Sequence, residues 1–128
     1  MRVADSTIEA SAQPMSDSSL RRERVRGMLR LLASEEEQLA YERDVPHVDM
    51  TDELLCMWFD DLYHGKAPSD DSAFDAAELA AICEFHRFYD QCSRGLPESR
   101  GTVRTWLDDP GWREIMEEAR MTLERIAE

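Results

Sequence analysis

Residues 75–95 read DAAELAAICEFHRFYDQCSRG and give the strongest indication of how this chain folds. The pair Asp75 and Glu78, three residues apart, is a capping box, which marks the start of a helix. Gly95 suits the position just after a helix, and Pro97 prevents the helix from continuing. Between these signals, apolar side chains at helical spacing form two adjoining stripes: Leu79, Ile82, His86 and Tyr89, and Ala81, Phe85, Phe88 and Cys92. A helix that is apolar over so much of its circumference is usually central in a bundle.

The sequence on both sides of this segment predicts further helices. A second capping box at Ser34–Glu37 opens a short helix, and Thr51 or Asp52 can cap the next one. The Asp-Pro pair at 109–110 opens the last helix. The expected helices cover about residues 20–33, 35–43, 52–64, 75–94 and 110–126, and residues 102–107 are expected to add one or two helical turns. No segment alternates long enough with the period of two that a strand requires, so we expect an all-α helical bundle of about four to five helices.

The chain is expected to contain one folded domain. A length of 128 residues is typical of a single domain. Residues 1–17 are rich in Ser, Ala and Asp and have too few large apolar side chains to pack, so we expect a disordered N-terminal arm. Residues 18–128 then form the helical domain.

Charge is distributed unevenly along the chain, whose net charge is −13. Past residue 33 there are 9 Lys/Arg against 24 Asp/Glu, whereas residues 1–33 carry 6 basic and 4 acidic groups. An acidic domain surface repels nucleic acid and anionic membranes and attracts a basic protein surface, so we expect a basic protein partner and neither nucleic acid nor membrane. The basic cluster at residues 21–30 is expected to pair with acids of neighbouring helices, unless the first helix swaps or docks.

The sequence contains no motif that specifies a reaction. A carboxylate pair at Asp60 and Asp61 and a thiol–imidazole pair at Cys83 and His86 are the candidates for chemistry. Adjacent residues of an α-helix point about 100° apart, and a zinc site needs three or four converging ligands. A reactive thiolate also needs a partly exposed, electropositive setting. We therefore expect no enzymatic activity, no metal and no cofactor.

The cysteines and the apolar runs indicate where in the cell the protein is expected. The three cysteines all lie within apolar helical patterns, as expected of reduced, buried thiols in the cytoplasm. The longest purely apolar run, residues 54–59, is far shorter than the ~20 residues that span a bilayer. The tryptophans are expected in the core, except that Trp106 sits between two loops and could be half exposed at an interface.

Three segments resemble small helical bacterial immunity proteins, which are encoded beside polymorphic or contact-dependent toxins. The segments are DVPHVDMTDELLCMWFDDLY at 44–63, DAAELAAICEFHRFYD at 75–90 and DPGWREIMEEARMTLERI at 109–126. The similar features are packing patterns within residues 44–127, and the arginine-rich first helix is not among them. The resemblance implies a protein that neutralises a cognate toxin by binding it, with no chemistry of its own and no fixed contact residues.

Charge and resemblance together predict a small acidic binding protein of the immunity or antitoxin type. The candidate contacts are exposed acids near aromatic residues, together with one tryptophan: Asp60, Asp61, Asp70, Asp71, Glu98, Trp106, Asp108 and Asp109. The alternative is a self-associating helical regulatory or structural module, in which an apolar face such as that of the first helix closes on its copy. The sequence leaves open whether the protein is a monomer or a homodimer.

Overall fold

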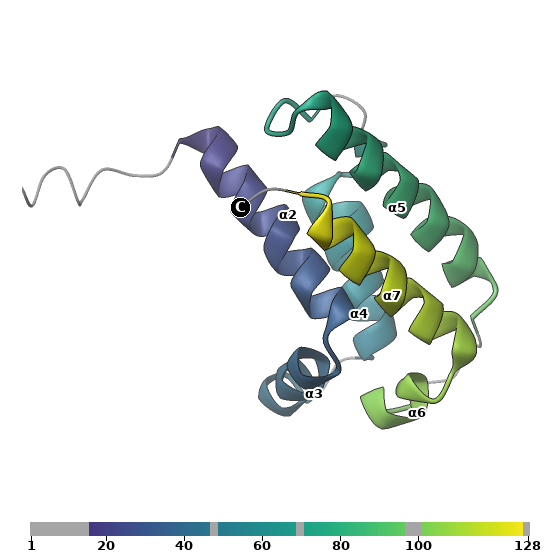
Figure 1. The fold of residues 1–128 in the computed structure, drawn as a ribbon. Helices are drawn as coiled ribbons and strands as arrows, with labels where there is room; N and C mark the ends of the chain where they lie inside the picture. Colours follow the sequence, from purple (N-terminus) through teal and green to yellow (C-terminus); the bar gives the residue numbers. More distant parts are fainter. Residues whose placement is uncertain (1–15, 47–48, 69–70, 97–100, 127–128) are drawn as a thin grey trace, which may run out of the picture.

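The computed structural model describes residues 16–46, 49–68, 71–96 and 101–126. Six helices pack together in this part of the chain, and it contains no strand, which confirms the all-α bundle (Figure 1). The helices are α2 (Asp17–Ala33), α3 (Glu35–Asp44), α4 (Met50–Cys56), α5 (Ala76–Arg94), α6 (Val103–Leu107) and α7 (Pro110–Glu124), and α4 runs directly into the π-helix η1 (Met57–Leu62). The arm expected at 1–17 lies outside the described residues, except that Ser16 and Asp17 belong to the start of α2.

The helix in the middle of the bundle is α7, whereas the sequence pattern favoured α5. Figure 1 shows α7 between α2 and α5, with α4 behind it, and α7 contacts both of its neighbours. Trp112, Ile115 and Ala119 of α7 are almost fully buried between these helices. In α5 each apolar stripe is buried only in part: Ile82 and Tyr89 of one stripe and Ala81 and Phe85 of the other are buried, and the other members, Leu79, His86, Phe88 and Cys92, are half-buried.

Most helix starts follow the predicted capping residues. Ser34 Oγ accepts from the Glu37 amide at 3.1 Å, and Asp75 accepts from the Glu78 amide at 2.8 Å in a complete capping box. Asp109 likewise caps α7. Two starts differ from the prediction, because side chains nearer the N-terminus supply the cap.

The two displaced starts are those of α2 and α4. Ser16 Oγ accepts from the Ser19 amide at 3.1 Å, so α2 begins at Asp17. Asp49 accepts from the amides of Thr51 and Asp52 at 3.1 and 3.3 Å, so neither of these two residues is the cap. Both helices are therefore slightly longer at their N-terminal ends than the sequence indicated.

A buried glutamine joins three helices. Gln38 of α3 is 1% exposed, and its Nε2 donates to the carbonyl oxygens of Leu31 and Leu32 at the end of α2. Its Oε1 accepts from Trp112 Nε1 of α7 at 3.0 Å. The last carbonyls of a helix have no partner within it, so Gln38 satisfies groups that burial would otherwise leave unpaired.

The π-helical turn η1 continues the buried face of α4. Met50, Leu54, Trp58 and Leu62 recur at every fourth position and are each at most 5% exposed. An α-helix has 3.6 residues per turn, so a spacing of four drifts around its axis, and a wider π turn at the C-terminal end compensates for that drift. Gly65, at φ 77°, donates its amide to the Phe59 carbonyl at 2.8 Å and ends the segment. Single π turns occur frequently at functional sites.

Candidate functional site

Two arginines of α2 are paired with acids from other parts of the chain, as the sequence predicted for this basic cluster. Arg21 Nε contacts Asp71 at 3.0 Å, and the guanidinium of Arg22 forms a fork on Glu78 at 2.8 and 3.1 Å. Buried Arg26 donates to the carbonyl of Ile126 at 2.8 Å. These interactions fix α2 against the start of α5 and the end of α7.

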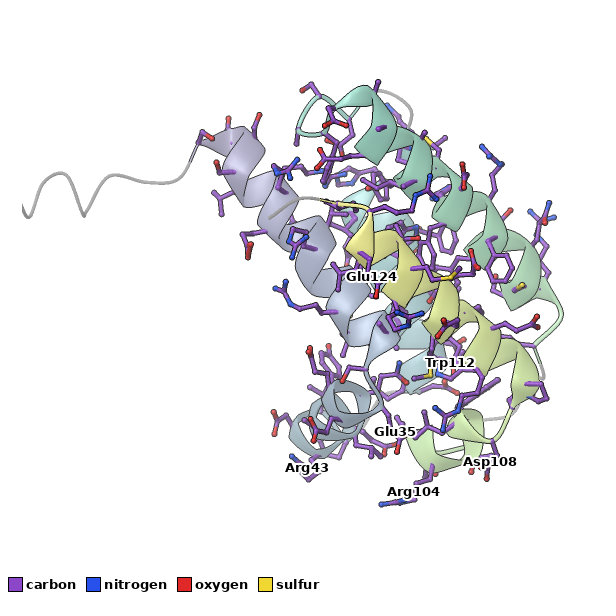
Figure 2. The ribbon with its side chains drawn as sticks, viewed as in Figure 1. Glu35, Arg43, Arg104, Asp108, Trp112 and Glu124 are labelled. Atoms are coloured by element: carbon purple, nitrogen blue, oxygen red, sulfur yellow. The ribbon has the colours of Figure 1, made fainter. Side chains whose placement is uncertain are left out.

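Many acids of the bundle are also neutralised by arginines. The further ion pairs are Glu23–Arg30, Glu35–Arg113, Glu84–Arg125, Asp90–Arg94, and Arg120 with both Glu117 and Glu124. They lie on α2, α3, α5 and α7, and Glu35 and Glu124 are marked in Figure 2. Part of the negative charge counted in the sequence is therefore compensated within the chain.

A second group of acids forms an acidic face on α4 and η1. It comprises Asp52, Glu53, Asp60 and Asp61, which surround the exposed Cys56. Cys56 is exposed and not buried as the sequence predicted, and the pKa of its thiol is raised by partial desolvation and by the charges of these four carboxylates.

The two aspartates of η1 are carboxylates of this face whose charge is not compensated by an ion pair within the described residues. In the described part of the chain, neither Asp60 nor Asp61 forms an ion pair, and both are exposed. Glu53 accepts from the hydroxyl of Tyr41 at 2.9 Å, so its hydrogen-bond partner carries no charge. The sequence analysis missed Asp52 and Glu53, although their spacing of four and three residues from Cys56 places them on one face of a helix.

The remaining predicted contacts are dispersed. Asp71 is paired with Arg21, Asp109 caps α7, and Asp108 is exposed beside α6 at one end of the bundle (Figure 2). Trp106 is 4% exposed, so the half-exposed position considered for it is not observed. The predicted residues Asp70 and Glu98 lie outside the described residues. The structure thus brings Asp60 and Asp61 together with new neighbours and does not join the full predicted set.

Of the candidates for chemistry, His86 lies in a packed aromatic cluster. His86 Nδ1 accepts a hydrogen bond from Trp58 Nε1 at 3.1 Å, and its ring also contacts those of Phe59 and Tyr63. Burial lowers the pKa of His86, which favours the neutral acceptor. Half-buried Cys83 has no hydrogen bond to His86 among the described residues. No group of three or more His, Cys, Asp or Glu side chains in the same residues could hold a metal ion.

A further hollow of the surface does not gather charge of one sign. It measures about 710 Å³ and lies between the start of α2 and the chain that follows η1. Lys66 and Asp17 line it, as do Arg21 and Asp71, which are already paired with each other at 3.0 Å. A ligand of either charge would have to compete with this pair.

Comparisons of the chain with protein-family models, with curated proteins and with solved structures found no match. The resemblance to immunity proteins stays a prediction from the sequence. Within the described residues, no helix has the length and apolar character needed to cross a membrane. The charge, burial and pairing of side chains are thus the observations from which a function can be inferred.

Proposed function

We propose that this protein is a small acidic binding protein that neutralises a cognate basic protein by direct association, as an immunity protein or antitoxin does. The observation that carries the proposal is that Asp60 and Asp61 are exposed, form no ion pair among the described residues and lie on one face with the carboxylates of Asp52 and Glu53. A carboxylate without a partner in its own chain retains its full charge for a Lys or Arg of another protein.

The acidic face suits fast capture of such a partner. Complementary charge steers encounter and raises association rates above the ~10⁵–10⁶ M⁻¹s⁻¹ of neutral surfaces, and salt weakens the effect. The face lies on a helix that is packed through Trp58, which is 0% exposed, so the carboxylates are held on a rigid element. Binding would place the acidic face over the basic surface that the partner uses, and it requires no cofactor and no reaction. This role is expected in the cytoplasm, where a toxin would have to be neutralised.

Self-association through the first helix is less well supported. Val25, Leu29 and Leu32 of α2 are fully buried within the chain, and α2 packs against α7. The apolar face that was to close on a second copy is therefore already covered. A net charge of −13 on each copy also opposes association.

The proposal is tested by charge reversal on the isolated complex. A tagged protein is used to recover its partner from the native cell, and the purified pair is then titrated at low and high salt. We expect one basic partner whose affinity falls with salt, and an Asp60→Lys/Asp61→Lys variant that binds at least about tenfold more weakly.

The matched control is Glu114→Lys/Glu118→Lys on α7, which changes the net charge equally at two acids with no ion pair among the described residues. Equal weakening by both variants would show that only net charge matters. Unchanged binding by the Asp60→Lys/Asp61→Lys variant would refute the acidic face as the binding surface. Recovery of the protein alone, with a mass that rises with concentration, would support self-association.

A further inference from the structure

A small apolar hollow borders the acidic face. It measures about 240 Å³ and lies between α2 and η1, with Gly27, Met28 and Leu31 on one side and Met57 and Leu62 on the other. The charged residues of its lining are Arg24 from α2 and Asp61 from η1, and both are exposed. Asp61 therefore belongs both to the hollow and to the acidic face.

Gly27 keeps this hollow open, although the fold does not require glycine there. It lies in the middle of α2, where glycine weakens a helix relative to alanine. A Cβ atom at this position would meet only the Arg30 guanidinium, at 3.7 Å, which is ordinary van der Waals contact. No close approach and no left-handed backbone explains the glycine. The structure does show one consequence of the missing side chain, which is the space between Gly27 and Met57.

We propose that the hollow receives one apolar side chain of the basic partner, and that a Lys or Arg next to that side chain binds Asp61. This inference rests on the proposed function. The volume is below the ~300–1,000 Å³ of small-molecule sites and suits a single side chain. The continuous acidic face beyond Asp61 selects a basic neighbour, and the stem of Arg24 can pack against the inserted group. An apolar anchor beside a charged contact is the usual composition of a binding hot spot.

The test uses two blocked pentapeptides, Lys-Lys-Leu-Lys-Lys and Lys-Lys-Ser-Lys-Lys, titrated into the full ¹⁵N-labelled chain. Amide shifts should saturate at residues of the hollow and of the acidic face, and the leucine peptide should bind roughly tenfold more tightly. Gly27→Leu fills the hollow from its own side and should make the two peptides equal. Gly27→Ala adds one methyl group and should preserve most of the difference. Asp61→Asn should weaken both peptides.

The outcomes separate the hollow from the acidic face. Equal affinity of the two peptides for the natural chain, with shifts on the acidic face, would overturn the inference and leave the proposed function standing. Shifts from neither peptide on this face would contradict both. The comparison within the natural chain needs no variant, so it decides the matter even where Gly27→Leu fails to fold. A leucine preference that persists in a folded Gly27→Leu variant would also overturn the inference.

Discussion

Gln38 offers a direct test of how the helices are held together. We predict that Gln38→Met, which preserves volume and removes every hydrogen bond of the amide, lowers the free energy of unfolding by about 2–4 kcal/mol. The variant leaves Trp112 Nε1 without its acceptor and the Leu32 carbonyl without its donor, while the Leu31 carbonyl still accepts from the Ser34 amide. Each buried polar group left unpaired costs about 1–3 kcal/mol, and total stabilities are only about 5–15 kcal/mol.

The assay is urea unfolding followed by far-ultraviolet circular dichroism, with the midpoint and the slope both fitted. Gln38→Glu is the companion variant. It retains an oxygen that accepts from Trp112, but it replaces the donating amide nitrogen with a second oxygen that faces two carbonyl oxygens. A charged carboxylate there is unfavourable, so Gln38→Glu should be less stable at pH 7 than near pH 4, relative to the natural chain. If the free energy of unfolding of Gln38→Met differs from that of the natural chain by less than about 0.5 kcal/mol, the hydrogen bonds of Gln38 do not hold the helices together, and the reasoning is refuted.

Three further predictions concern other contacts. Protonating His86 removes the acceptor that Trp58 needs, and burial holds the pKa of His86 below its ordinary 6.5 in the folded chain. The unfolded chain thus binds the proton more readily, so stability should fall as pH drops below about 6.5, and His86→Gln should reduce that fall in paired unfolding titrations. Arg22→Ala removes the guanidinium fork from Glu78, which is 5% exposed, and should lower the free energy of unfolding by about 2–4 kcal/mol in urea titrations. Adding Glu78→Gln to this variant removes the uncompensated charge and should restore part of the lost stability. If the double variant restores none of it, the charge is not the cause. Gly27→Ala should raise the free energy of unfolding by up to about 1 kcal/mol, which is measured as a higher urea midpoint. A lower midpoint would reveal a packing role for the glycine.

Helix positions could be read from the sequence because the signals are local. The pairs Asp75–Glu78 and Ser34–Glu37 act between residues three positions apart, so their effect does not depend on the rest of the fold. Asp49 was missed because three candidate caps, Asp49, Thr51 and Asp52, lie within four residues, and the choice depends on how α4 packs. The π turn was missed for a related reason. It depends on aligning Trp58 and Leu62 with the core.

The sequence by itself determined the all-α class, most helix starts and the excess of negative charge, since these follow from residue types and short spacings. Only the tertiary structure decided which charges remain free. Arg21 and Asp71 are 50 positions apart, and Arg22 and Glu78 are 56 apart, so no local pattern reveals their pairing. The sequence placed Asp60 and Asp61 among several candidate contacts, and only the fold shows that the arginines lie elsewhere while Asp71 is paired. A side chain pairs with whatever packing brings within reach, so the acidic face and its neighbouring hollow are properties of the folded chain.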